Sequence, residues 1–273
     1  MFFPVTLSQT FLENWPSDLR NMSIPSEEIE LSHDDLNVLG GYSRIFRDLV
    51  DYNDDAFFSE NFQANIEDIT KKWPKGVFPR IGFCSWKETE YQILPCYGVR
   101  GVLSTITADN ERVGRAIATH SSGNTPLFLH LREYHPLAPW SEFRMFIRDR
   151  RLVGVSQYHH HAAYPEIEEH VTPIKATLKA FSRDLIDVLH MDSVVADVFV
   201  EQHDGRDFKT TLIELNPFLW RTDPCLYSWK SGGDFDGGFR YRKIRYNPYR
   251  NTSVLGKHSE PIGHFREDDY RRS

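Results

Sequence analysis

The sequence has few cysteines, no long apolar run and no leader-like start. Cys84, Cys96 and Cys225 are its three cysteines and include no CxxC pair, which argues against a disulfide framework and against a cysteine-rich zinc site. No apolar run approaches the roughly 18 residues that a membrane span needs. The opening MFFPVTLSQTFLENW has neither the basic start nor the cleavage site of a signal peptide. We therefore expect a cytoplasmic protein with reduced thiols.

The sequence also lacks the short motifs of several common enzyme classes. It contains no GxxxxGK(S/T), GxGxxG or GxSxG, so a P-loop, a Rossmann dinucleotide site and a serine hydrolase have no support. What is present is a chain of 273 residues that is 40% hydrophobic, 14% aromatic and 26% charged. This composition is typical of a globular protein of about two domains.

Lysine is absent from the front segment 1–70, which holds 14 Asp and Glu against three Arg. This front segment is net −11, whereas the whole chain is −7, so the remainder is net +4. The overall charge would disfavour an anionic ligand, but the acidic residues are concentrated at the front. We interpret the front segment as a surface for a basic partner and the remainder as compatible with a nucleotide.

The hydrophobic pattern predicts helices joined by loops in the front segment, followed by β-rich segments. Residues 76–83 and 97–107 are β-rich, and residues 126–131 (PLFLHL) are typical of a buried strand. FRMFI and LVGVSQY flank the polar turn RDRR (148–151) as the strands of a hairpin do.

The second half of the chain predicts one helix and a second hairpin. Apolar residues recur at steps of four, three, four and three, which predicts a helix that ends near His190: Ile174, Leu178, Phe181, Leu185 and Val188. SVVADVFVE and TTLIELNPF, with Asp204-Gly205 between them, predict the hairpin. After Tyr227 periodicity is lost, in an acidic loop (SGGDFDGG) and a basic aromatic tail.

The second hairpin carries the most informative polar residues. Glu214 and Asn216 are two apart on one predicted strand and so share a face, and Asp197 lies at a suitable distance on the preceding strand. Two carboxylates and an amide oxygen suit a hard cation such as magnesium, held jointly with nucleotide phosphates. The alternative is that Asp197 and Glu214 merely face solvent on an exposed sheet.

Arginine and histidine residues near the strands have two interpretations each. Arg80, Lys87, Arg132 and Arg144 lie in or beside β-rich segments, where they could bind phosphate or simply be solvated. His159, His160 and His161 invite a metal hypothesis. Because neighbours on a strand point to opposite faces, we favour a solvated strand end for this run.

Three blocks of the sequence resemble the cell division cycle protein 123 family, whose members have an ATP-grasp fold. VFPRIGFCSWKE (77–88) is similar to the family's FPKLNWS segment. Residues 131–157 resemble its LRKW…P…EFRCFV…LVGISQ segment, and residues 196–229 resemble its DVY…IDFNPF…TDSLLF segment. The resemblance implies an α+β, ATP-grasp fold, with two α/β lobes and a nucleotide cleft between antiparallel sheets.

With this resemblance we expect an N-terminal lobe in 1–125, an ATP-grasp lobe in 126–240 and the basic aromatic tail in 241–273. The family's magnesium ligands fall on Asp197, Glu214 and Asn216. Its other ATP-binding positions fall on a phosphate-binding loop, an adenine hinge and a ribose and phosphate pair: Arg80, Phe83, Ser85 and Lys87; Glu133, Tyr134 and His135; Glu142 and Arg144. Arg80 and Glu214 stand where the family has Lys and Asp. These replacements keep the charge but change the length of the side chain. Trp86 interrupts a loop of small residues, and Tyr158 replaces a basic residue.

The family's role, as the resemblance implies it, is that of an ATP-binding chaperone that helps to join the alpha and gamma subunits of eukaryotic translation initiation factor 2. We expect this chain to be a monomer. An alternative is an ATP-grasp ligase that forms an acyl phosphate for attack by an amine. A further alternative is RNA binding by the run FRYRKIRYNPYR. We favour over it a tail whose tyrosines pack on the protein body and whose arginines lie in water.

Overall fold

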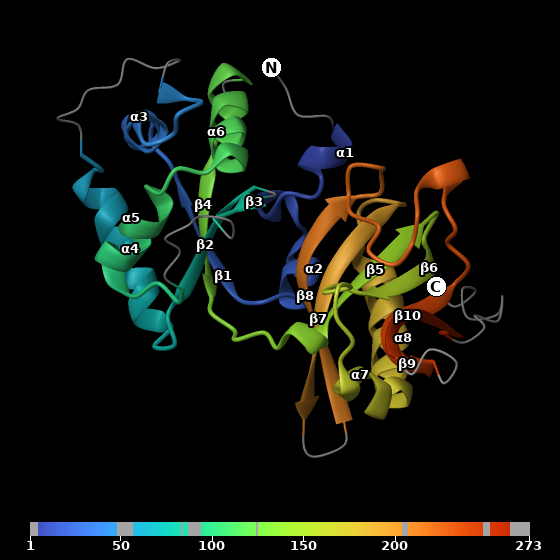
Figure 1. Ribbon diagram of the computed structural model, residues 1–273. Helices are drawn as coiled ribbons and strands as arrows, with labels where there is room; N and C mark the ends of the chain where they lie inside the picture. Colours follow the sequence, from blue (N-terminus) through green and yellow to red (C-terminus); the bar gives the residue numbers. More distant parts are fainter. Residues whose placement is uncertain are drawn as a thin grey trace. The chain divides into compact units, whose positions relative to one another are not determined.

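The computed structural model describes residues 5–47, 57–82, 84–86, 94–123, 125–203, 207–247 and 252–262. The chain forms two compact units, Met1–Pro136 and Leu137–Ser273, and each contains its own β-sheet (Figure 1). Within the described ranges, we find no helix with both the length and the apolar character that a membrane crossing requires.

The first unit is built on a four-stranded antiparallel sheet of order β1-β4-β2-β3. Its strands are β1 (Ser26–Glu30), β2 (Val77–Ile81), β3 (Cys84–Ser85) and β4 (Phe128–Glu133). Its helices are α1 (Val5–Ser8), η1 (Leu12–Asn14), α2 (Ser17–Asn21), α3 (His33–Gly41), α4 (Glu60–Lys72), α5 (Gly98–Ile106) and α6 (Glu111–Gly123). The structure confirms the predicted strands around residues 76–83 and 126–131.

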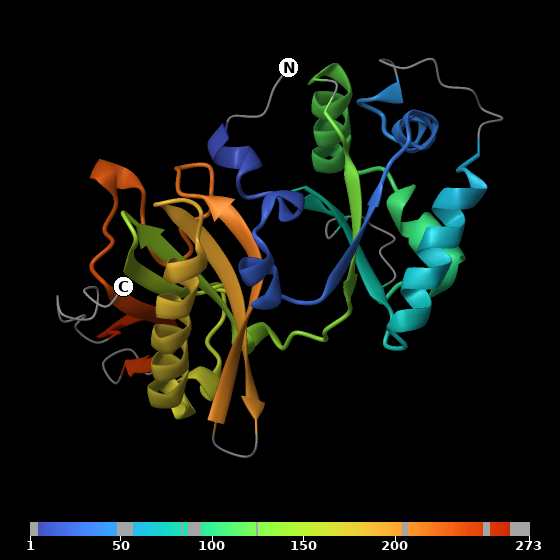
Figure 2. The same ribbon diagram turned by 180° about the vertical axis from the view of Figure 1, so that it is seen from behind.

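Helices α4 and α5 lie side by side against the first sheet (Figure 2). The apolar face of α4 presents Phe62, Ile66 and Ile69 to the core, where each is buried. The sheet contributes Ile81 and Leu129, which are fully buried. This packing buries the apolar face of an amphipathic helix, which supplies most of the stability that such a helix has in a protein.

The structure overturns one prediction and adds one strand in this unit. Residues 97–107, predicted as β-rich, contain α5, because Val99, Val102, Leu103 and Ile106 recur at helical spacing and bury one face. The helical spacing of these apolar residues therefore outweighs the preference of β-branched residues for strands. The acidic segment Ser26–Glu30 forms β1 at the edge of the sheet, where charged side chains also discourage pairing with another chain.

Asp35 is a buried carboxylate that connects the starts of α3 and α4. It accepts hydrogen bonds from the Ser59 backbone N–H at 2.7 Å, the Ser59 hydroxyl at 2.9 Å and the Ser32 hydroxyl at 2.6 Å. The same two serines are the N-caps of the helices: Ser32 accepts from the Asp35 N–H and Ser59 from the Phe62 N–H. One side chain therefore orients two helix caps.

We expect Asp35→Ala to lower the free energy of unfolding of the first unit by about 2 kcal/mol, because it removes the acceptor shared by both caps. Urea unfolding followed by circular dichroism would measure the change. Asp34→Ala is the matched control, since Asp34 lies in the same helical turn and is exposed. Equal losses in the two variants would contradict the capping role.

The second unit is built on a six-stranded sheet of order β10-β9-β6-β5-β7-β8. Neighbouring strands are antiparallel except β6 and β9, which are parallel. The strands are β5 (Glu142–Arg148), β6 (Arg151–Gln157), β7 (Val194–His203), β8 (Asp207–Pro217), β9 (Gly238–Asn247) and β10 (Thr252–Pro261). The helical segments are η3 (Pro139–Ser141), α7 (Pro165–Glu169), α8 (Val171–Val188) and η4 (Lys230–Gly232), and α8 lies along one face of the sheet (Figures 1 and 2).

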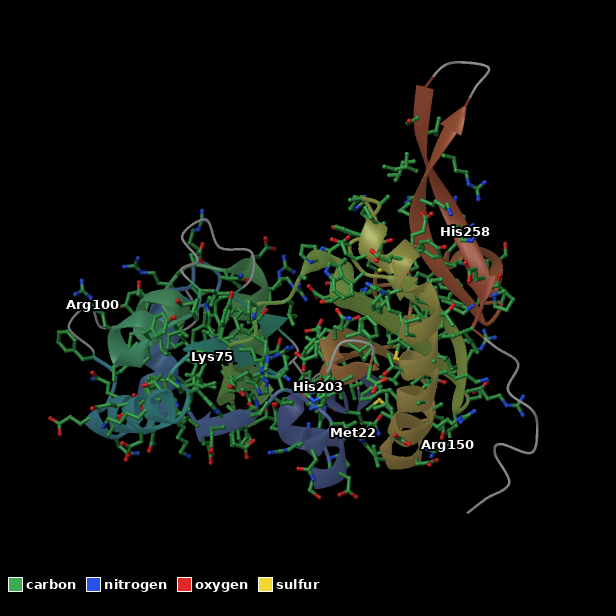
Figure 3. All side chains as sticks on the ribbon, turned by 90° about the horizontal axis from the view of Figure 1, so that it is seen from below. Met22, Lys75, Arg100, Arg150, His203 and His258 are labelled. Atoms are coloured by element: carbon green, nitrogen blue, oxygen red, sulfur yellow. The ribbon has the colours of Figure 1, made fainter. Side chains whose placement is uncertain are left out.

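Both predicted hairpins and the predicted helix are confirmed. β5 and β6 meet at Asp149 and Arg150, which both have positive φ, as a two-residue hairpin turn of type I′ requires. The Arg150 guanidinium also donates to the Leu189 and Ile186 carbonyls at the end of α8 (Figure 3). A cation at this position stabilises a helix C-terminus.

The basic aromatic segment is not a loose tail in the residues that the structure describes. Residues 238–247 and 252–261 form the β9–β10 hairpin, whose end away from His258 projects beyond the rest of its unit (Figure 3). Its base is joined to the sheet, where Phe239 and Tyr241 are buried. The prediction that tyrosines of this segment pack on the protein body is confirmed for Tyr241.

Gly154 on β6 marks a place where a loop packs closely on the sheet. A Cβ at this position would lie 2.6 Å from the Tyr227 ring, so only glycine leaves room for it. The Tyr227 hydroxyl donates to the Gly238 carbonyl, and the Arg240 guanidinium stacks 3.7 Å from the ring centre. These contacts fix residues 222–229 over one face of the second sheet.

Candidate functional site

Strand register places the predicted cluster of polar residues on one face of the second sheet. Arg144 on β5 is opposite Asp197 on β7, and Asp197 is opposite Glu214 on β8. Asn216 follows two residues later on the same face. A β-bulge beside Asp197 shifts the register of β7 and β8, a feature that often re-aims side chains near functional sites.

Asp197 is the centre of this cluster. Arg144 donates to both of its oxygens, with Nε to Oδ1 and Nη2 to Oδ2 both at 2.7 Å. The Asn216 Nδ2 donates to Asp197 Oδ2 at 3.1 Å and to Glu214 Oε1 at 3.3 Å. The side chains of Arg144 and Asp197 are only 6% and 4% exposed. Asn216 thus bridges two carboxylates, one of which forms a buried, bidentate ion pair.

The burial of this pair changes the ionisation of its members. Burial raises the pKa of Asp197 to about 6, and Glu214 adds to the rise while Arg144 opposes it. Burial lowers the pKa of Arg144, but the Asp197 charge and hydrogen bonds outweigh this, so that pKa lies above its ordinary value. The guanidinium is therefore charged, and the two carboxylates compete for a positive partner.

Further side chains border the same face. The Arg144 guanidinium lies 4.8 Å from the centre of the Tyr158 ring, and burial raises the pKa of Tyr158, with the Asp197 charge adding to the rise. Glu142, two residues before Arg144, contacts the His159 Nε2 at 3.0 Å. Tyr158 is thus a neutral phenol stacked on a guanidinium.

The donor set of the cluster fits a hard cation. Asp197 and Glu214 supply carboxylate oxygens, and a half-turn of the Asn216 amide would replace its NH2 by its carbonyl oxygen between them. Three oxygens from side chains are the type of ligand that magnesium takes. Asp197 is already held by Arg144, which orients the carboxylate and balances part of its charge.

The predicted phosphate-binding residues of the first unit lie on neighbouring strands. Arg80 on β2 is paired with Ser85 on β3 and with His130 on β4, and its side chain is buried. Arg132, also on β4, donates to the Ser23 hydroxyl at 2.6 Å, so it has a structural role. Phe83 and Lys87 lie outside the described residues.

The predicted adenine hinge follows directly from β4. Glu133 is the last residue of that strand, and its N–H donates to the Pro25 carbonyl at 3.0 Å. The Tyr134 N–H donates to the Gly76 carbonyl at 3.0 Å, and the His135 Nε2 lies 3.5 Å from Glu133 Oε2. These two amides are engaged within the first unit, so an adenine edge would have to use other backbone groups of this segment.

The structure also places Asp223 and Cys225 beside the cluster, which the sequence did not predict. The Asp223 carbonyl accepts from Arg144 Nη1 at 2.7 Å. Cys225 has a positive φ of 52°. In the sequence, these two residues stand out only because they lie in the segment 196–229 that resembles the family. That resemblance does not say which side chains they contact.

Comparisons with known proteins agree with the resemblance. A sequence model of the D123 family matches residues 47–234. The "Translation initiation factor eIF2 assembly protein" of Vanderwaltozyma polyspora is 32% identical over 102 residues, which are 37% of this chain and 27% of that protein. The protein of that name from Xenopus laevis is 31% identical over 103 residues, 37% of this chain and 29% of that protein. The one from Candida albicans is 23% identical over 200 residues, 66% of this chain and 56% of that protein. The chain thus spans little more than half of the length of these relatives at most.

A solved structure shows the same fold. Cdc123 from Schizosaccharomyces pombe superimposes with a TM-score of 0.67 at 19% identity, over 84% of this chain and 92% of that chain. The predicted α+β architecture, with a sheet in each of two parts, is confirmed. Because the family model covers well over half of its residues, the chain belongs to the D123 family.

Proposed function

We propose that this chain is an ATP- and magnesium-binding factor that assists the assembly of eukaryotic translation initiation factor 2. Its relatives carry the name of eIF2 assembly proteins. The observation that carries the nucleotide part is the cluster on the second sheet, where Asn216 bridges the buried Asp197 and the half-buried Glu214 beside Arg144. Burying charged side chains costs free energy, so packing of the core does not explain this cluster. Its oxygen atoms are ligands that a cation can use.

Each residue of the cluster has a distinct part in this proposal. Asp197, Glu214 and Asn216 would hold magnesium, which neutralises phosphate charge when it is bound. Arg144 orients Asp197 through its two hydrogen bonds and keeps a positive charge beside the cation site. Glu142 is positioned by His159 on the same face. For the first unit we keep the residues that the resemblance assigns to the binding of phosphate and adenine: Arg80, Phe83, Ser85, Lys87, Glu133, Tyr134 and His135.

The protein partner in this proposal is the gamma subunit of the initiation factor. The acidic front segment 1–70, with its net charge of −11, is a surface that a basic protein region would complement. A purified C-terminal domain of the gamma subunit should therefore be retained by the chain in a pull-down with ATP and magnesium. Absence of binding under these conditions would remove the assembly role.

Calorimetric titration with ATP and magnesium tests the site. We expect Glu214→Gln to weaken magnesium-dependent binding of ATP by at least about tenfold, which corresponds to about 1.4 kcal/mol, because it removes one anionic ligand. Glu201→Gln is the matched control, since Glu201 is exposed on the adjacent strand. Equal affinity in wild type and Glu214→Gln would refute the assignment.

Analysis of the nucleotide recovered from the same titration separates an assembly factor from an ATP-grasp ligase. A factor that uses ATP as a structural ligand returns it intact. A ligase releases ADP or phosphate, and the release depends on an added carboxylic acid and amine. Neither outcome changes which side chains hold the cation, so the binding test and the turnover test are independent.

A further inference from the structure

A second cluster of potential ligands lies beside the first and differs from it in chemistry. His160 follows β6, and Asp223 and Cys225 follow β8, yet their ligand atoms all lie within 4.8 Å of one another. The donors are an imidazole nitrogen, a carboxylate oxygen and a thiol sulfur. Magnesium takes oxygen ligands, whereas nitrogen and sulfur donors in one site favour a softer cation such as zinc.

One nitrogen of the His160 imidazole is engaged by a hydrogen bond. Its Nδ1 lies 3.0 Å from the Tyr158 carbonyl, which can only accept, so Nδ1 donates there and Nε2 is the nitrogen left for a metal. The His160 carbonyl accepts from Arg242 Nε at 2.8 Å. A histidine whose other nitrogen donates to a backbone carbonyl is the usual arrangement of a zinc ligand.

The segment that carries the other two ligands is fixed by polar contacts. The Cys225 N–H donates to Asp223 Oδ1 at 2.8 Å, and the Leu226 N–H donates to the Ser156 hydroxyl at 3.1 Å. Cys225 adopts a left-handed conformation, with φ at 52°, which is uncommon for a residue other than glycine and is found where surrounding contacts enforce it. The turn therefore holds the thiol and the carboxylate on the side of His160.

The charges around this place are of both signs. The Arg144 guanidinium acts on the Cys225 thiol and is paired with Asp197, and Asp223 adds a second carboxylate. Burial raises the pKa of Cys225 to about 12, so the free thiol is protonated at neutral pH. A metal ion binds the thiolate and displaces this proton.

We propose that His160, Asp223 and Cys225 form a binding site for a zinc-like divalent cation, with its fourth position open to water or to a ligand. The site does not depend on the proposed nucleotide function, because none of its three ligands belongs to the magnesium cluster. The bond lengths of zinc are roughly 2.0–2.3 Å, so the donors, which lie within 4.8 Å of one another, would move inward when the ion binds.

Cobalt(II) is a suitable probe, because a thiolate bound to it gives a charge-transfer absorption in the near ultraviolet. We expect the full chain, stripped of metal, to bind one equivalent of cobalt with this absorption, and zinc to displace it. Cys225→Ser should abolish the absorption. His160→Gln should weaken zinc binding by at least about tenfold, whereas His161→Gln, which alters the exposed neighbour, should leave it unchanged.

Three results would overturn the site. One is the absence of a thiolate absorption in the wild-type chain. Another is its persistence in Cys225→Ser, which would assign it to the buried Cys84 or Cys96. The third is displacement of cobalt by millimolar magnesium, since that would show binding at the oxygen cluster instead. Far-ultraviolet circular dichroism of each variant separates loss of the site from loss of the fold.

Discussion

Replacing Arg144 by methionine is expected to lower the free energy of unfolding of the second unit by about 3–5 kcal/mol. The substitution leaves Asp197, whose side chain is 4% exposed, buried without its two guanidinium hydrogen bonds. It also removes the donor that the Asp223 carbonyl uses. The main cost is the stranded carboxylate, because the methionine itself fills much of the space of the arginine stem.

A double-mutant cycle tests this explanation. Arg144→Met combined with Asp197→Leu removes both charges and should recover at least half of the loss, because a buried ion pair can often be exchanged for apolar residues. Arg151→Met, at an exposed position in the same hairpin, should change stability by less than about 0.5 kcal/mol. Urea unfolding followed by circular dichroism, without nucleotide, measures all of these proteins. If the losses in the free energy of unfolding of the two single variants simply add in the double variant, the ion pair is not the source of the stability.

This ion pair also shows what a sequence can and cannot predict about such a site. The positions of Glu214 and Asn216 on one strand follow from local alternation, and the β7–β8 hairpin brings Asp197 opposite Glu214 through a short connection. Arg144 reaches Asp197 because β5 pairs with β7, although the two residues are far apart in the sequence. The sequence of neither hairpin shows that β5 of one pairs with β7 of the other.

The errors in secondary structure have local causes. Residues 98–106 are rich in valine, isoleucine and threonine, but their apolar members recur every three to four residues and form α5. In the basic segment, Phe239 and Tyr241 alternate with Arg240 and Arg242, which is the period of a strand with its apolar side chains on one face. The abundance of charge hid this alternation, since Arg240 is buried as well and is paired with Asp234 and Asp236.

The His160, Asp223 and Cys225 cluster lies beyond sequence analysis for a different reason. The helix α8 and the whole β7–β8 hairpin separate His160 from the other two members along the chain. The three meet because residues 222–229 pack over the sheet, with Tyr227 above Gly154. The strand alternation assumed for the three consecutive histidines does not apply, because β6 ends at Gln157 and they lie in the turn after it. His160 is the one of the three that takes part in the cluster. The turn after β6 and the packing of an aromatic loop, rather than a motif, decide which histidine it is.

Exchange of Asn216 for aspartate is expected to make the stability of the second unit depend on magnesium. In the absence of a cation, the Asn216 Nδ2 is the hydrogen-bond donor that separates Asp197 from Glu214. Asn216→Asp replaces this donor by a third carboxylate, so it removes two hydrogen bonds to charged groups and adds like-charge repulsion. The expected loss is about 2–4 kcal/mol, or roughly 5–15 °C in Tm.

Magnesium should reverse much of this loss, because three carboxylates bind a divalent cation more strongly than two carboxylates and an amide, and a ligand of the folded state stabilises it in proportion to its affinity. The measurement is the Tm of wild type and variant with and without magnesium at matched ionic strength. Asn21→Asp, the same change at an exposed position of the first unit, should show no dependence on magnesium beyond that of the wild type. If Asn216→Asp is destabilised equally with and without magnesium, the three side chains do not share a cation, and Asn216 serves only to keep two carboxylates apart.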